Sequence, residues 1–259
     1  SEPELQPVST GWGRLDDLIK PFYPSLMVVT GMAMSGKSTF VNQMVAQMNL
    51  QHGWKAAIAS FEMRVKPFVT STLAAVYHQY GGDPAKLDRW MDENFMFIAP
   101  EPSEEDREFD IDWLIEKAIT AVVRSGIRQL IIDPWNEIEH AVGRRESLTE
   151  YTGRAIRSLK RFGKEFDCMV CVVAHPTKNA AQRVLNDPEK ISELSLYDVS
   201  DSAHFANKAD LGIVINRHGL HTDDLVTTIA VKKVRYQPVS GLVGSTTICF
   251  NKETQLFSQ

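Results

Sequence analysis

The chain has 259 residues, of which 43% are hydrophobic and 24% are charged, a composition typical of a folded globular protein. Its formal net charge of -5 excludes a uniformly basic surface, so contact with nucleic acid has to come from local basic loops. No apolar stretch is long enough to cross a membrane, and the three cysteines show no spacing typical of a disulfide framework or a zinc site.

Apolar stretches typical of buried strands alternate along the chain with stretches of helical periodicity. The predicted strands cover residues 26–29, 56–61, 95–99, 129–133 and 168–174, and the predicted helices include residues 40–45, 65–80, 111–124 and 148–166. Residues 176–208 show no regular pattern, which favours a connection that is either functional or disordered. Further strands over residues 211–215, 226–234 and 242–250 predict C-terminal β-hairpins. This alternation predicts an α/β fold with a mainly parallel sheet flanked by helices.

The first 25 residues differ from the rest of the chain. They are polar and contain proline, and no initiator Met precedes them. We therefore expect a lead-in segment over residues 1–25, one domain over residues 26–259, and a chain that is either processed or a fragment of a longer protein.

A phosphate-binding loop follows the first predicted strand. Gly31 to Ser38 read GMAMSGKS, a complete GxxxxGK[ST] motif, and a helical pattern follows it at once. In such a loop the backbone wraps around phosphates, Lys37 reaches the β- and γ-phosphates, and Ser38 ligates Mg²⁺. We predict binding of ATP with Mg²⁺; a chance match in a loop is the alternative. The predicted nucleotide-binding residues are Gly31, Met34, Ser35, Gly36, Lys37, Ser38 and Thr39.

Three polar residues end or directly follow predicted strands, at the edge of the sheet where ligands collect in open α/β folds. Glu62 can orient or deprotonate an attacking water, or it can be a solvated residue at the start of a helix. Asp133 can hold Mg²⁺ opposite Ser38, or it can form a turn with Pro134. His175 can hydrogen-bond to a γ-phosphate, or it can be a structural histidine.

A basic pair ends the strand predicted over residues 226–234. Lys233 and Arg235 are two residues apart, so on a strand they point to the same face and can reach one phosphate together as an arginine finger. Protection of an edge strand by charge is the alternative. Because such fingers often come from a neighbouring subunit, the pair predicts an oligomer with shared active sites.

Two loops are candidates for binding single-stranded nucleic acid, because both follow strands at the catalytic edge and carry basic residues. Neither loop is densely basic or rich in aromatic residues, so a solvated loop is the alternative. The candidate residues are Asn136, Arg144, Arg145, Lys178, Asn179 and Arg183.

Taken in order, these motifs resemble the RecA-like helicase domain of the DnaB/Twinkle family of hexameric replicative helicases. The resemblance covers nearly the whole chain, and His at position 175 in place of Gln favours the Twinkle or phage branch. The matching segments are Ser9-Thr10-Gly11 with Leu15-Asp16, GMAMSGKST, Ser60-Phe-Glu62-Met63, Leu130-Ile-Ile-Asp133-Pro-Trp-Asn136, Val173-Ala-His175-Pro-Thr-Lys178, Ser202 to Asp210, and Lys233-Val-Arg235.

The resemblance implies a RecA-like P-loop NTPase fold and a motor that hydrolyses ATP, binds single-stranded DNA and unwinds duplex in the 5′–3′ direction. It implies Glu62 as the catalytic base, His175 as the γ-phosphate sensor, and Lys233 with Arg235 as the finger. It also implies a homohexameric ring, a primase domain or partner, and a cytoplasmic or nucleoid location, organellar for a Twinkle-like protein. Two other functions stay open: a RecA- or KaiC-like ATPase of recombination or signalling, and a slow ATP-gated assembly or loader module.

Overall fold

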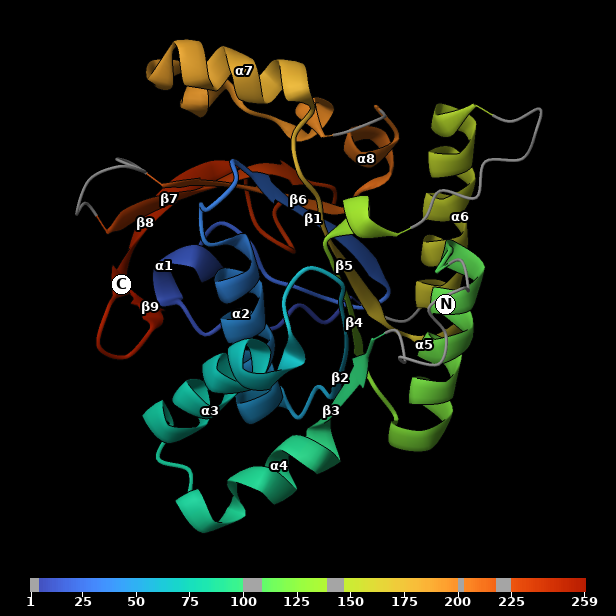
Figure 1. Ribbon diagram of the computed structural model, residues 1–259, viewed down its shortest axis with the longest axis vertical. Helices are drawn as coiled ribbons and strands as arrows, with labels where there is room; N and C mark the ends of the chain where they lie inside the picture. The colour runs from blue at the N-terminus through green and yellow to red at the C-terminus, as the bar shows by residue number, and fades with distance from the viewer. Residues whose placement is uncertain (1–4, 100–108, 139–146, 200–202, 218–224) are drawn as a thin grey trace.

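A nine-stranded sheet lies at the centre of the part of the chain that the computed structural model describes, residues 5–99, 109–138, 147–199, 203–217 and 225–259 (Figure 1). The strand order is β3-β2-β4-β5-β1-β6-β7-β8-β9. The strands from β3 to β6 in this order pair in parallel, and the pairs from β6 to β9 are antiparallel. The predicted mainly parallel sheet with C-terminal hairpins is confirmed.

The structure has these strands: β1 Ser25–Gly31, β2 Ala56–Ser60, β3 Phe95–Ile98, β4 Gln129–Asp133, β5 Met169–Val173, β6 Leu211–Arg217, β7 Val226–Val234, β8 Gly244–Asn251 and β9 Leu256–Ser258. The α-helices are α1 Gly13–Asp16, α2 Lys37–His52, α3 Thr70–Gln79, α4 Leu87–Asn94, α5 Ile111–Ser125, α6 Leu148–Phe166, α7 Lys178–Asn186 and α8 Ala203–Lys208. Short π- or 3₁₀-helical turns are η1 Val65–Val69, η2 Pro84–Lys86, η4 Trp135–Glu137, η5 Pro188–Glu193 and η6 Leu196–Asp198.

Helices cover both faces of the parallel strands, which explains why these strands read as continuous apolar stretches. On one face α2, α3 and α4 pack on the sheet, and on the other face α5 and α6 do (Figure 1). Phe40 and Met44 of α2 are fully buried in the first core, and Leu114 of α5 and Leu159 of α6 are fully buried in the second. The sheet is thus held rigidly between two apolar layers.

The described part of the lead-in segment belongs to the first of these cores. Trp12 stacks on Phe40 of α2, with ring centroids 4.9 Å apart and an interplanar angle of 6°. Leu15 and Ile19 are fully buried, and Asp16 accepts hydrogen bonds from Thr10 at 2.7 Å. Residues 5–25 therefore pack on the same domain as the strands that follow.

The expectation of an irregular loop over residues 176–208 is wrong, because this segment contains α7, η5, η6 and α8. Helix α7 begins after Thr177, whose hydroxyl accepts a hydrogen bond from the N–H of Ala180. Only Ala180 and Val184 of this helix are buried. Its apolar face is too narrow for helical periodicity to reveal it.

Gly31 provides a test of the close approach between β1 and β6. Its φ is 152°, and a Cβ there would lie 2.2 Å from the carbonyl oxygen of Ile215. We expect Gly31→Ala to lower the free energy of unfolding by about 3 kcal/mol, because a backbone atom cannot move aside as a side chain can. Urea denaturation measures the loss.

The matched control is Gly53→Ala at the end of α2. Gly53 also has a positive φ, 70°, but nothing lies within 4 Å of the position that a Cβ would take. The loss there should be about 1 kcal/mol, the cost of the left-handed conformation alone. Equal losses for the two variants would show that contact with Ile215 is not the cause.

Candidate functional site

The phosphate-binding loop connects the carboxyl end of β1 to α2. Gly36 precedes α2 with a φ of 87°, and no side chain caps the helix, so its first N–H groups are left for a ligand. The hydroxyl of Ser35 is buried and has no hydrogen-bond partner among the described residues. These unpaired donors fit the oxygens of a bound phosphate.

The other predicted residues of this loop lie at its tip and in the first turn of α2. Met34 has a φ of 62° and an exposed side chain, so it marks the outer turn of the loop. Ser38 and Thr39 are half-buried beside Lys37 in the first turn of the helix. The loop thus presents backbone and short polar side chains to a ligand.

Lys37 is buried and lies across the loop. Its Nζ donates to the carbonyl oxygens of Gly31 at 3.0 Å and Met32 at 2.8 Å. Burial lowers the pKa of Lys37 to about 8, although attraction by Asp133 and Glu62 works in the opposite direction. A phosphate anion next to this ammonium would favour its charged form.

Asp133 ends β4 and is buried, and burial raises the pKa of its carboxyl group. The Ser38 hydroxyl donates a hydrogen bond to it, and the charge of Lys37 lowers its pKa in part. The structure therefore brings together the two residues predicted to hold Mg²⁺. This ion usually binds through one or two protein oxygens, substrate phosphates and water, so the pair fits it.

Glu62 and His175 meet at the same edge. The Oε2 atom of Glu62 lies 3.5 Å from Nε2 of His175, and the Glu62 side chain is 61% exposed. The charges of both residues, like that of Lys37, act on the pKa of Asp133. Lys37, Ser38, Glu62, Asp133 and His175 thus form one cluster, as their positions after neighbouring strands predict.

Lys233 and Arg235 lie elsewhere. Val234 pairs with Leu211 at the amino end of β6, whereas Gly31 of the phosphate loop pairs with Ile215 near its carboxyl end. Both basic side chains point to the same place, the last turn of α8, as their spacing predicts. They are therefore not part of this chain's own phosphate-loop cluster.

The candidate nucleic-acid residues have different environments. Asn136 accepts a hydrogen bond from the backbone N–H of His175 at 2.8 Å, so it braces the site. Lys178 and Asn179 are exposed in the first turn of α7. Arg183 pairs with Asp198 at 2.9 Å. Arg144 and Arg145 lie outside the described residues.

Two features were not predicted from the sequence: the hydrogen bond from the His175 N–H to Asn136, and the contacts of the Asp210 carboxylate. Asp210 is buried and contacts Arg235, Lys160 and the backbone of Leu26. A carboxylate immediately before an apolar strand was the available signal. Its partners are far away in sequence, so no local pattern identifies them.

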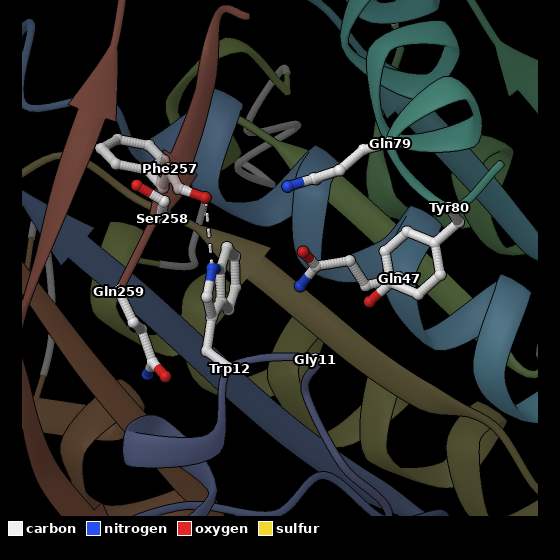
Figure 2. A pocket seen from close by; sticks show the side chains of 8 residues that line it. All are labelled: Gly11, Trp12, Gln47, Gln79, Tyr80, Phe257, Ser258 and Gln259. Carbon is white, nitrogen blue, oxygen red and sulfur yellow. Dashed lines mark hydrogen bonds between the residues drawn. The ribbon is translucent and has the colours of Figure 1, made fainter.

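A separate pocket of about 420 Å³ lies between the lead-in segment, α2, α3 and β9. Figure 2 shows the indole of Trp12 donating to the carbonyl oxygen of Phe257, at 3.4 Å, with the amide of Gln47 nearby. None of the predicted site residues lines this pocket. Its lining residues are Gly11, Trp12, Gln47, Gln79, Tyr80, Phe257, Ser258 and Gln259.

Comparison with known proteins shows the family. Residues 9–181 match the family model described as AAA domain. The chain belongs to the AAA domain family. The matched residues of this AAA domain include the phosphate loop, Glu62, Asp133 and His175, so the cluster lies within the shared part of the family.

The AAA chain is 35% identical to the Twinkle homolog protein, chloroplastic/mitochondrial, of Arabidopsis thaliana over 268 aligned residues. The alignment covers 97% of this chain and 36% of that protein, so the chain spans about a third of the length of the curated relative it matches. The resemblance to DnaB/Twinkle helicases predicted from the motifs is confirmed. No helix among the described residues is long and apolar enough to cross a bilayer.

Two solved structures share the fold. An ATPase domain aligns with a TM-score of 0.73 and 18% identity, covering 100% of this chain and 93% of that one. A DnaB-like replicative helicase, solved in a study of its interactions with primase, aligns with a TM-score of 0.75 and 17% identity. The alignment covers 99% of this chain and 64% of that one. The predicted RecA-like α/β fold is confirmed.

The contribution of the hydrogen bond between Asn136 and the His175 backbone can be tested by measuring the free energy of unfolding. We expect Asn136→Ala to lower the free energy of unfolding by about 1 kcal/mol, because the half-buried N–H of His175 loses its acceptor. Urea denaturation gives the value. Asn179→Ala, at an exposed position, is the control and should change it by less than about 0.5 kcal/mol; a similar loss there would contradict the bracing role.

Proposed function

We propose that this AAA domain is the motor of a replicative DNA helicase, hydrolysing ATP to translocate on single-stranded DNA and unwind duplex. The observation that carries the proposal is the cluster of Lys37, Ser38, Glu62, Asp133 and His175 at one edge of the sheet. The similarity to a Twinkle homolog over nearly the whole chain supports helicase function.

ATP binding begins at the phosphate loop. The uncapped N–H groups of α2 bind the phosphates, and Lys37 exchanges the carbonyl oxygens of Gly31 and Met32 for phosphate oxygens. Ser38 and Asp133 would hold Mg²⁺, whose charge neutralises that of the phosphates. The residues present thus supply both a cation and metal ligands.

Hydrolysis uses the exposed carboxylate of Glu62. It orients a water and accepts its proton as the water oxygen attacks the γ-phosphorus and the bond to the bridging β–γ oxygen breaks. His175, 3.5 Å from Glu62, donates a hydrogen bond to a γ-phosphate oxygen and loses this contact when phosphate leaves. The two residues link the chemistry to the following loop.

Movement on DNA follows from the position of His175. Pro176 and Thr177 connect it to α7, whose first turn exposes Lys178 and Asn179. We assign contact with the DNA backbone to these two residues. Loss of the contact between His175 and the γ-phosphate would then shift α7 and displace the bound single-stranded DNA. Lys233 and Arg235 serve the nucleotide of a neighbouring copy in a hexameric ring, and a primase domain or partner acts with it.

Glu62→Gln should bind ATP as tightly as the parent protein and hydrolyse it about 10²-fold or more slowly, because an amide cannot accept the proton. Nucleotide binding, phosphate release with and without single-stranded DNA, and unwinding of a forked duplex measure the effect. Glu116→Gln, on the exposed side of α5, is the control and should keep full turnover.

Normal hydrolysis by Glu62→Gln would remove this residue as the base. Failure of the parent protein to displace a strand from the fork, despite turnover stimulated by single-stranded DNA, would overturn the helicase assignment. The result would then favour an ATPase that moves or assembles without unwinding.

ATP binding above pH 8 should be coupled to proton uptake. Lys37, with a pKa of about 8, is largely neutral there, and the phosphates raise its pKa on binding. Calorimetric titration at about pH 9 in buffers of different ionisation enthalpy counts the protons, and uptake should shrink at about pH 6.5, where the lysine is charged in both states.

Lys37→Met should remove this uptake, whereas Lys164→Met, on the surface of α6, should retain it. An unchanged proton count in Lys37→Met would show that another group titrates. The two variants therefore assign the proton to a single side chain.

A further inference from the structure

Asp210 is a buried carboxylate at the junction of α8 and β6, and its side chain is 5% exposed. It contacts Nε of Arg235 at 2.7 Å and Nζ of Lys160 at 2.9 Å. Its Oδ2 also accepts the backbone N–H of Leu26 at 2.9 Å. One carboxylate thus joins the finger residue to α6 and to the first residues of β1.

The guanidinium of Arg235 is held on two of its three nitrogens. Nε pairs with Asp210, and Nη2 donates to the carbonyl oxygens of Asn207, Lys208 and Ala209 at 3.1, 3.4 and 3.2 Å. Nη1 makes no hydrogen bond or ion pair within the described ranges, and the side chain is 38% exposed. Nη1 is therefore the nitrogen left to bind a ligand.

Lys233 is held in the same way. Its Nζ donates to the carbonyl oxygens of Ala206 and Asn207 in the same turn of α8. Burial and the charge of Arg235 lower the pKa of Lys233, while Asp210 raises it in part. The carboxylate thus also offsets the repulsion between the two cations of the finger.

This arrangement prevents Arg235 from reaching the phosphate loop of its own chain. The carboxylate of Asp210 accepts a hydrogen bond from the N–H of Leu26 at the amino end of β1, and Gly31 lies five residues further along the strand. At about 3.3 Å per residue, these two ends are about 17 Å apart, well beyond the reach of an arginine held by Asp210. The nucleotide that Nη1 can contact belongs to a second copy.

We propose that Asp210 is the positioning residue of the arginine finger, fixing the Arg235 guanidinium for the γ-phosphate bound by a neighbouring copy of this chain. The inference rests on the proposed function, in which active sites are shared between copies. A planar fork held at two nitrogens loses little further freedom when the third binds phosphate. Asp210 touches neither substrate nor metal and acts through Arg235.

The first test compares Asp210→Asn with Lys160→Met in the assembled protein. Asp210→Asn keeps the shape of the side chain and an oxygen that accepts the N–H of Leu26, but it loses the ion pair with Arg235. The rate of ATP hydrolysis should therefore fall about 10²-fold, with unchanged ATP affinity. Lys160→Met breaks the other ion pair of the same carboxylate and should leave turnover unchanged. Equal losses in both variants would make Asp210 a structural residue and overturn the inference.

The second test mixes inactive subunits. Asp210→Asn subunits keep an intact phosphate loop, and Lys37→Ala subunits keep an intact finger, so a mixture restores complete sites at about a quarter of its interfaces by random assortment. Basal hydrolysis should return, as it should for Arg235→Ala mixed with Lys37→Ala. No recovery with Asp210→Asn, alongside recovery with Arg235→Ala, would overturn the inference and leave the proposed function standing.

Failure of both mixtures would instead overturn the sharing of sites between copies, and with it the basis of the inference. Urea denaturation checks that Asp210→Asn is folded. If Asp210→Asn does not fold, the double variant Lys160→Met/Asp210→Asn also removes the ammonium of Lys160, which the single variant leaves without its carboxylate. This double variant is then mixed with Lys37→Ala subunits in the same way. Recovery there supports the positioning role, and no recovery opposes it.

Discussion

The parallel register of β2, β4, β5 and β1 is the constraint on which the site depends. Ser60 pairs with Asp133, and Val29 pairs with Val173, so the residues that follow these strands emerge at one edge at the same height. A shift of one residue would turn Asp133 to the opposite face of the sheet and remove it from Ser38. The two apolar layers that cover the sheet hold this register, so the core determines the geometry of the site.

Two buried charged groups at this edge, Lys37 and Asp133, are only partly stabilised by their neighbours in the chain. Burial disfavours the charged forms of both Lys37 and Asp133, which compensate one another only in part. In the proposed function, a triphosphate would stabilise the ammonium of Lys37, and a divalent cation would stabilise the carboxylate of Asp133. Binding would therefore relieve two desolvation penalties that the folded chain carries alone, while the more exposed Glu62 stays accessible to water.

The sequence was sufficient for the sheet and for the five clustered residues, because local signals mark both. Alternating apolar stretches reveal buried strands, and polar residues directly after them have to emerge at a shared edge. Helices α4 and α7 were missed because they bury few residues, so their periodicity is weak, and strand β9 was missed because it is only three residues long. The ion pair of Arg235 with Asp210 could not be predicted, since the two residues meet only through tertiary packing.

The elements that follow His175 end close to the finger. Pro176 pairs with Val199 as a β-bridge, and the N–H of Thr177 donates to the carbonyl oxygen of Asp198 at 2.7 Å. Further along the chain, α8 carries the carbonyl oxygens of Asn207 and Lys208, which accept hydrogen bonds from Arg235. The residues that follow His175 are therefore packed against other elements and do not form a free loop. Since Asp210 ties the end of α8 to Leu26 of β1, the strand that carries the phosphate loop, the finger and the phosphate loop of one chain are anchored to the same sheet.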